Sequence, residues 1–168
     1  MPTVRLTRRY RFSAAHRLAT PLLSAEENRA VFGKCNNPHG HGHDFTVELS
    51  LLGAPDERTG RLVPLAALDQ FASEVVLKPF DRRNMNVEIA DFAALVPTTE
   101  NLAVVLARRV ASAWPVWFAG SPARFEKLRI WETKRNIFEM SVPAAPEGEE
   151  AGRESHSDEI IQSRSSTV

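Results

Sequence analysis

Histidine and glycine alternate in one short segment of this sequence, His39-Gly40-His41-Gly42-His43, which holds three of the five histidines. A further histidine, His16, ends an earlier segment of alternating polar and apolar residues. Alternate side chains of an extended backbone point to the same face, so histidines at this spacing can meet one from a neighbouring strand. Three imidazoles with an open fourth position hold a catalytic Zn²⁺, and the glycines allow the backbone to bend around an ion. The pattern predicts a metal site, although His16 could be a packed core residue and the repeat a loop that binds nothing.

Cys35 is the single cysteine of the chain and lies six residues before His41. Lys34 precedes it and a polar turn, Asn36-Asn37-Pro38, follows it. A thiolate near a metal ion and cationic side chains can act as a base or a nucleophile. A lone cysteine is otherwise an inert buried thiol, because its reactivity depends on a lowered pKa. Spacing alone leaves both roles open.

The elements that must position these residues begin with two segments of period-two alternation, which is typical of half-buried strands. Residues 4–16 alternate, with only Arg8 interrupting the apolar side, and residues 43–51 alternate again. A turn is expected at 53–60, where Pro55 and Asp56 are turn formers. We expect the two strands to pair as an antiparallel ribbon.

Apolar residues at helical spacing predict a helix that begins at Pro64 and is ended by Pro79. A second helix is predicted from Thr98 or Thr99, either of which can cap free amides, to about Trp114. Two more strands are predicted at 125–132 and 137–142, joined by a polar turn. The order β-β-α-α-β-β indicates an α+β domain with an antiparallel sheet and helices on one face. The exposed sheet edges suggest that other copies of the chain complete the sheet.

Length and charge limit the classes of protein to which the chain can belong. Its 168 residues are expected to form one catalytic domain, 1–143, and an acidic, disordered tail, 144–168, which has six acids, two bases and no aromatic residue. A net charge of zero argues against a nucleic-acid partner, and one cysteine cannot form an internal disulfide. No apolar stretch reaches the roughly 20 residues that span a bilayer, and no signal peptide is recognised. We therefore expect a soluble, cytoplasmic protein without a membrane partner.

Several motifs together resemble the 6-pyruvoyl tetrahydropterin synthase family. They are Phe-Ser-Ala-Ala-His-Arg-Leu at 12–18, Val-Phe-Gly-Lys-Cys-Asn-Asn-Pro at 31–38, Gly-His-Gly-His at 40–43, Lys-Pro-Phe-Asp at 78–81, Pro-Thr-Thr-Glu-Asn at 97–101 and Glu-Thr at 132–133. The resemblance covers nearly everything from residue 4 to residue 142 and leaves out the acidic tail. The joint pattern is highly specific.

The resemblance implies a zinc-dependent lyase with the tunnelling fold, in which the sheets of three subunits close into a barrel and two trimers stack into a homohexamer. The implied reaction converts 7,8-dihydroneopterin triphosphate, bound at a subunit interface, to 6-pyruvoyl tetrahydropterin with elimination of triphosphate. This reaction belongs to tetrahydrobiopterin biosynthesis. A bound Zn²⁺ would polarise the side-chain oxygens of the substrate and acidify the adjacent C–H bonds.

The resemblance also implies a role for each matching residue. The Zn²⁺ ligands are His16, His41 and His43 by position, and Cys35 is the base that removes side-chain protons. Glu132 corresponds to the acid that binds the pterin, since a carboxylate accepts two parallel hydrogen bonds from the ring N–H and the exocyclic amine. Further matching positions are Thr98, Thr99 and Glu100 in the pterin pocket and Asp81 in a proton relay.

Two residues depart from the pattern of the family. Arg82 follows Asp81, where the family usually has the histidine of a Cys-Asp-His relay; arginine cannot shuttle a proton, but it can stabilise a thiolate or bind triphosphate. His39 stands where the biopterin enzymes usually have asparagine, and its spacing from Cys35 matches the bacterial 6-carboxytetrahydropterin synthase of queuosine biosynthesis. The long insertion at 22–37 favours the biopterin type, so His39 is expected to lie near the ligands or at the surface.

Three functions therefore remain open. The first is the triphosphate lyase that yields a pyruvoyl product. The second is 6-carboxytetrahydropterin synthase, which takes the same substrate but releases acetaldehyde. The third is a pterin- or zinc-binding homologue whose catalysis is lost or altered because of Arg82. A substrate with several negative charges needs convergent cations, for which Arg17, Lys34 and Arg82 are candidates that the sequence does not rank.

Overall fold

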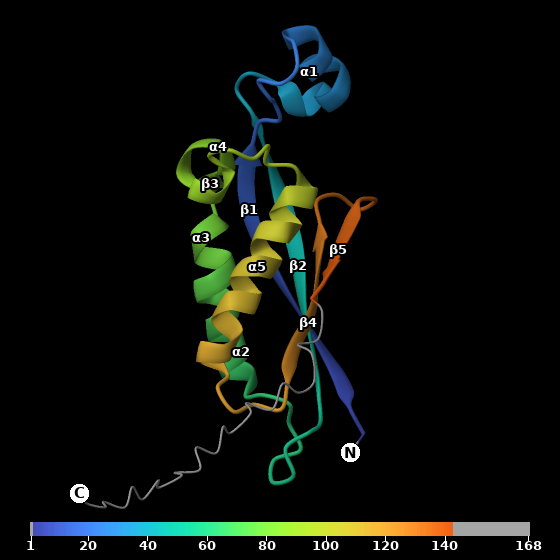
Figure 1. Ribbon diagram of the computed structural model, residues 1–168, viewed down its shortest axis with the longest axis vertical. Coiled ribbons are helices and arrows are strands. Elements are labelled where there is room, and N and C mark those ends of the chain that lie inside the picture. The colour runs from blue at the N-terminus through green and yellow to red at the C-terminus, as the bar shows by residue number, and fades with distance from the viewer. Residues whose placement is uncertain (1, 143–168) are drawn as a thin grey trace, which may run out of the picture.

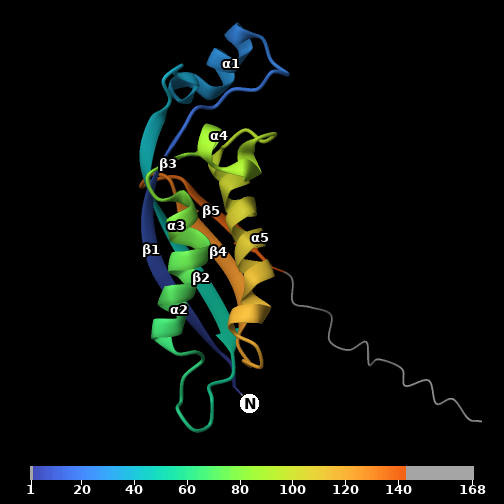
Figure 2. The same cartoon turned by 90° about the vertical axis from the view of Figure 1, so that its left-hand side faces the viewer.

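The computed structural model describes residues 2–142, and the predicted acidic tail lies outside the described residues. A five-stranded sheet, in the order β3-β1-β2-β4-β5, carries its main helices on one face (Figures 1 and 2). The elements are β1 Val4–His16, α1 Ala25–Phe32, β2 His41–Gly53, α2 Leu65–Ala72, α3 Lys78–Phe80, β3 Arg83–Asn84, α4 Met85–Glu88, α5 Thr99–Trp117, β4 Arg124–Trp131 and β5 Ile137–Ser141. This arrangement confirms the predicted mixed α+β class.

The β1–β2 ribbon is antiparallel, as predicted, and pairs along the whole of both strands, from Val4 opposite Gly53 to His16 opposite His41. The first strand has the predicted bounds, whereas the second begins two residues earlier and ends two residues later than the alternation suggested. Glycines at both ends of β2 interrupt the alternation without interrupting the backbone hydrogen bonds. The longer pairing brings His16 and His41 face to face.

The core lies between the inner face of this ribbon and the helices α2 and α5. Phe12 and Phe45 stack across the strands with ring centroids 5.3 Å apart, and both are buried. Arg8, the residue that interrupts the apolar side of β1, forms an ion pair with Asp69 of α2. The hydroxyl of Tyr10 also donates to Asp69, at 3.0 Å. The positive charge of Arg8 is therefore paired with a carboxylate at the edge of the core.

The first long helical segment continues one residue past Pro79, to Phe80, so the expectation that Pro79 ends it was wrong. Between α2 and α3 the chain makes a π-helical turn, Ser73–Leu77. Proline has no N–H, and its ring clashes with the carbonyl four residues back in a regular α-helix. The wider turn includes Val75, the residue four positions before Pro79, and allows the helical path to continue.

The last helix, α5, begins after Thr98, whose hydroxyl accepts a hydrogen bond from the Asn101 N–H at 3.3 Å. Of the two candidate caps, Thr98 is therefore the one used. The helix continues to Trp117, three residues beyond the predicted end. The extra turn is stabilised by aromatic packing that periodicity did not reveal, since Trp114 stacks on Phe118 with centroids 4.2 Å apart.

The sheet is not wholly antiparallel, which corrects the sequence-based expectation. The two-residue strand β3 pairs with β1 in parallel, Ala14 lying opposite Arg83. The strands β4 and β5 are antiparallel, as predicted, and β5 forms the other edge of the sheet. Among the described residues, no helix is both long and apolar enough to cross a membrane.

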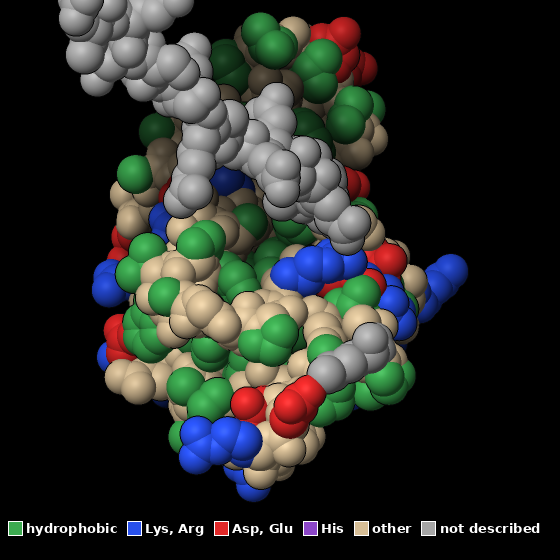
Figure 3. Space-filling model, turned by 60° about the horizontal axis from the view of Figure 1, so that its bottom comes forward, with side chains coloured by type: hydrophobic (Ala, Val, Ile, Leu, Met, Phe, Trp, Pro, Cys, Tyr) green, Lys and Arg blue, Asp and Glu red, His purple; other side chains and the backbone are tan. Residues whose placement is uncertain are grey.

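A pocket of 830 Å³ lies at the end of the molecule away from α1, between the 53–64 connection and the end of α5. Trp117 and Phe118 line it together with Leu62 and Pro122. Figure 3 views the molecule toward this end and shows hydrophobic side chains at the surface. Neither histidine nor cysteine lines this pocket, so the chemistry has to be sought at the opposite end of the ribbon.

Candidate metal and active site

Three imidazoles converge where the paired ends of β1 and β2 meet. The Nε2 atoms of His16 and His41 are 3.3 Å apart, and those of His41 and His43 are 2.8 Å apart. One ligand atom from each of the three residues lies within 4.8 Å of the others. His16 and His41 face each other across the ribbon, and His43 follows two residues later on the same face, as the period of a strand requires.

The orientation of His16 is fixed by the segment that leads into α5. Its Nδ1 lies 2.8 Å from the carbonyl oxygen of Pro97, and because a carbonyl only accepts, Nδ1 must donate. The lone pair is then on Nε2, the atom that points at His41. Metal-bound histidines in proteins are commonly held by this kind of outer hydrogen bond. Burial, above all, lowers the pKa of both His16 and His43, which favours the neutral form that can bind a metal.

The histidine set fits a tetrahedral Zn²⁺ with one open position. Two nitrogens bound to tetrahedral Zn²⁺ at about 2.0–2.1 Å lie about 3.3 Å apart, which is the separation seen between His16 and His41. Facing nitrogen lone pairs at 2.8 Å, as in the pair His41 and His43, repel each other unless a proton or a cation lies between them. The donor set is therefore suited to a cation.

Gly40 allows this approach of the two strands. It has a φ of +67°, and a Cβ built there would lie 2.9 Å from the carbonyl oxygen of His16. Any side chain would collide with backbone, so the residue before His41 must be glycine for the strand to start at this point. At Gly42 a Cβ would be 3.7 Å from the Ala14 carbonyl, an ordinary contact. The expected need for glycine therefore holds for Gly40 and not for Gly42.

Glu132 lies beside the histidines, and its charge acts on a second predicted residue, Cys35. Glu132, directly after β4, places Oε1 3.8 Å from Nε2 of His43, and only 14% of its side chain is exposed. Cys35 lies in the 3₁₀ turn Gly33–Asn36, where its carbonyl accepts a 2.7 Å hydrogen bond from the Leu18 N–H. Burial, followed by the negative charge of Glu132, raises the pKa of the Cys35 thiol. The thiol is thus protonated at neutral pH unless positive charge is added.

The three predicted pterin-pocket residues at the start of α5 lie in different environments. Thr98 uses its hydroxyl as the helix cap, and Glu100 is exposed in the first turn. Thr99 is buried, and its hydroxyl oxygen has no hydrogen-bond partner within residues 2–142. A buried hydroxyl without a hydrogen-bond partner costs free energy. Of these three residues, Thr99 is therefore the one whose side chain a polar ligand would stabilise by a hydrogen bond.

The structure does not bring Asp81 into the histidine cluster of the same subunit. Its carboxylate accepts a 2.9 Å hydrogen bond from the Ser13 N–H at the edge of β1, roughly 10 Å along the strand from His16. Arg82 has a φ of 59°, unusual for a residue with a side chain, and its side chain is 89% exposed. Arg82 lines a shallow pocket with His43 and Asp44, and its charged group is open to solvent.

His39 and the insertion before it complete the surroundings. His39 is exposed in the turn before β2 and lies outside the cluster. The insertion contains α1, a helix that the sequence analysis missed. Its signal was available: Ser24 and Glu27 form a capping box, in which the Ser24 hydroxyl accepts from the Glu27 N–H and the Glu27 carboxylate accepts from the Ser24 N–H.

The sheet and its histidine cluster define a small α+β protein that gathers metal-binding side chains at one end of a two-stranded ribbon. A family model described as 6-pyruvoyl tetrahydropterin synthase matches residues 5–142. The chain belongs to the 6-pyruvoyl tetrahydropterin synthase family.

Individual relatives agree with this assignment. The human protein named 6-pyruvoyl tetrahydrobiopterin synthase is 39% identical over 132 residues, which cover 79% of this chain and 87% of the relative. The protein of that name from Poecilia reticulata is 44% identical, with 79% and 86% covered. The solved structure of Caenorhabditis elegans 6-pyruvoyl tetrahydropterin synthase has a TM-score of 0.77 at 37% identity, covering 85% of this chain and 98% of that chain. A Plasmodium vivax structure at 14% identity shares the fold, with a TM-score of 0.58 over 84% of this chain and 100% of that chain.

Proposed function

We propose that this protein is a zinc-dependent lyase that converts 7,8-dihydroneopterin triphosphate to 6-pyruvoyl tetrahydropterin and releases triphosphate, a step of tetrahydrobiopterin biosynthesis. The observation that carries the proposal is the convergence of the His16, His41 and His43 nitrogens beside the Glu132 carboxylate, in a chain of this family. The names of the relatives support the pyruvoyl product over the carboxy product.

The residues divide the chemistry between them. His16, His41 and His43 would hold the Zn²⁺, which would supply a Lewis acid for the side-chain oxygens of the substrate and positive charge that favours the Cys35 thiolate. The Sγ atom of Cys35 accepts a proton from the substrate side chain. Burial of the site keeps water from competing for that proton.

Glu132 and the start of α5 bind the pterin in this proposal. The Glu132 carboxylate accepts two parallel hydrogen bonds from the ring N–H and the exocyclic amine, which fixes the ring with its side chain toward the histidines. Thr99 gains a partner for its buried hydroxyl when a polar ring atom is present. Thr98 acts through the cap that places Thr99, and Glu100, exposed in the first turn of α5, is a further contact for the pterin in this proposal.

We further propose that the enzyme works in the cytoplasm as a homohexamer built from two trimers, each closing its sheets into a barrel. The edge position of β5 supports this, since it leaves backbone groups free to pair with another copy. The position of Asp81 supports it as well. This carboxylate binds the Ser13 N–H and lies outside the histidine cluster of its own subunit, which is consistent with a catalytic role at an interface between copies.

The test is to incubate the zinc-loaded protein with dihydroneopterin triphosphate, measure triphosphate release and identify the pterin side chain. We expect release with a pyruvoyl product. A carboxy product with acetaldehyde would identify the queuosine-type enzyme instead. Pterin binding without release would identify a homologue with lost catalysis, the function that the exposed Arg82 favours.

The Cys35→Ala variant tests whether Cys35 is the base that accepts a proton from the substrate. Turnover should be lost while zinc content stays at the wild-type level, because Cys35 is not one of the three converging ligands. Unchanged turnover in this variant would remove Cys35 from the mechanism.

A further inference from the structure

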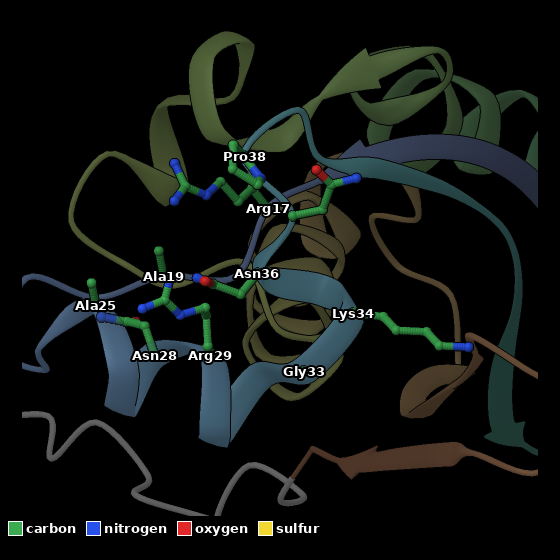
Figure 4. Close-up of a pocket in the computed structure, with 10 residues that line it drawn as sticks. Arg17, Ala19, Ala25, Asn28, Arg29, Gly33, Lys34, Asn36 and Pro38 are labelled. Atoms are coloured by element: carbon green, nitrogen blue, oxygen red, sulfur yellow. The ribbon is translucent and has the colours of Figure 1, made fainter.

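A pocket of 560 Å³ lies beside the segment that carries Cys35, between the end of β1 and helix α1 (Figure 4). Arg17, the residue after His16, lines one side, and Arg29 of α1 lines another. Lys34, the residue before Cys35, is also part of the wall. The pocket therefore adjoins the candidate active site through residues next to a metal ligand and the proposed base.

The lining of the pocket carries positive charge and no carboxylate among the described residues. No aspartate or glutamate lines it, and its other polar side chains are asparagines. Within residues 2–142 neither Arg17 nor Arg29 makes an ion pair, whereas many arginines on the sheet do, as Arg9 does with Glu48 at 2.7 Å. Both are exposed, so the two guanidinium groups are free to bind an anion.

The two arginines extend to the same side of the pocket. In Figure 4 the side chains of Arg17 and Arg29 both run toward the side of Ala19 and Ala25, whereas Lys34 extends the opposite way. The two guanidinium groups therefore line the same side of one pocket. Lys34 lies within the 3₁₀ turn Gly33–Asn36.

The backbone that carries these arginines is held by buried asparagines. The Asn28 Oδ1 accepts a 2.8 Å hydrogen bond from the Thr20 N–H, and its Nδ2 donates to the Thr20 carbonyl at 2.9 Å. The Nδ2 of Asn36 donates to the Leu18 carbonyl at 2.8 Å. The α1 segment is thus fixed against the chain that follows β1, and the spacing of the two arginine backbones is set before any ligand binds.

We propose that Arg17 and Arg29 form a binding site for the phosphate groups of a polyphosphate anion. The planar guanidinium group donates two parallel hydrogen bonds to phosphate oxygens, and two such groups suit an extended anion with several charges. The anion is either the triphosphate of the substrate, which rests on the proposed function, or a free polyphosphate that binds independently of catalysis. Arg29 is the residue that this proposal adds to the earlier candidates, and Arg82 is not part of the site.

The first experiment measures binding of inorganic triphosphate by calorimetry, which requires no turnover. The variants are Arg17→Ala and Arg29→Ala, with Arg58→Ala as the matched control, since Arg58 is an exposed arginine in the 53–60 turn at the other end of the molecule. We expect the Kd to rise roughly 10-fold in each of the two pocket variants, from the loss of charged hydrogen bonds, and to stay at the wild-type value in the control. Equal Kd values in all four proteins would overturn the proposal.

Steady-state kinetics with dihydroneopterin triphosphate then distinguishes the two sources of the anion. If the site binds the substrate's own triphosphate, inorganic triphosphate competes with substrate, and Arg29→Ala raises KM with little change in kcat. If the site binds a separate anion, the calorimetric effect remains while competition and the KM change are absent. Both results support the site and differ only in its occupant.

The outcomes also separate this proposal from the proposed function. Arginine-dependent triphosphate binding in a protein without lyase activity would keep the site and remove the function. Normal turnover to the pyruvoyl product, with triphosphate affinity independent of Arg17 and Arg29, would keep the function and remove the site.

Discussion

Replacement of His41 by alanine is expected to remove most of the metal affinity, whereas replacement of His39 is expected to leave it intact. The two histidines lie two residues apart in the same Gly-His repeat, but only His41 places its Nε2 within 3.3 Å of His16 and 2.8 Å of His43. His39 is exposed in the preceding turn and contacts neither. Comparing the two variants therefore tests whether zinc binding depends on the three-histidine cluster or only on the number of histidines in this segment.

The magnitude follows from the number of ligands. Structural Zn²⁺ sites with four protein ligands bind with about 10–16 kcal/mol, which corresponds to about 3 kcal/mol for each ligand. Loss of His41 leaves two of three protein ligands, so the zinc dissociation constant should rise roughly 100-fold. The half-buried position of His41 makes the alanine variant easier to tolerate than one at the fully buried His16.

Competition with a chromophoric chelator gives the dissociation constant, and elemental analysis of the dialysed protein gives the stoichiometry. We expect one Zn²⁺ per chain in the wild type and in His39→Ala, and substoichiometric zinc in His41→Ala. Circular dichroism of the metal-free proteins controls for folding. Wild-type affinity in a folded His41→Ala variant, or an equal loss in His39→Ala, would refute the three-histidine site.

Three further outcomes follow from the structure. Glu132→Gln should lower the pKa of Cys35, because the negative charge of Glu132 raises it; the pH dependence of iodoacetamide alkylation in metal-free protein measures this, and an unshifted curve would contradict it. Burial lowers the pKa of His16, so the unfolded chain binds more protons than the folded one, and the free energy of unfolding of the metal-free protein should fall as the pH drops below about 6.5. Denaturant titrations across this range check the sign, and greater stability toward acid would show it to be wrong. Thr98→Ala removes the hydrogen bond to the Asn101 N–H and should cost about 1 kcal/mol, whereas Thr98→Ser should keep most of it; thermal unfolding compares the two.

The parts of the fold that could be predicted are those in which a single periodic pattern extends over many residues. The strand Val4–His16 has the predicted bounds because its two faces meet core and solvent in strict alternation. The end of the first helical segment was misjudged because a π turn accommodates Pro79, and no local rule reports such a turn. The parallel pairing of Arg83 and Asn84 with β1 depends on contacts distant in sequence, which periodicity cannot show.

For the candidate site, too, some features could be predicted from the sequence and others were seen only in the folded structure. The histidine repeat, its partner His16 and the spacing to Cys35 were visible in the sequence, and the resemblance selected His41 and His43 from the repeat. The bond from His16 to the Pro97 carbonyl, which orients the ring, links residues 81 positions apart. Only the folded chain could show that Thr98 is the helix cap and that Thr99 has a buried hydroxyl without a partner.

The sequence by itself determined the residue types, the strand on which most of them lie and the family to which the chain belongs. These properties are local, since they depend on the order of side chains along a strand. The tertiary structure alone decided how closely the His16, His41 and His43 nitrogens converge, and that Asp81 lies outside this cluster within one subunit. The physical reason is the register of the β1–β2 ribbon: pairing His16 with His41 fixes which side chains share a face and how far apart they lie.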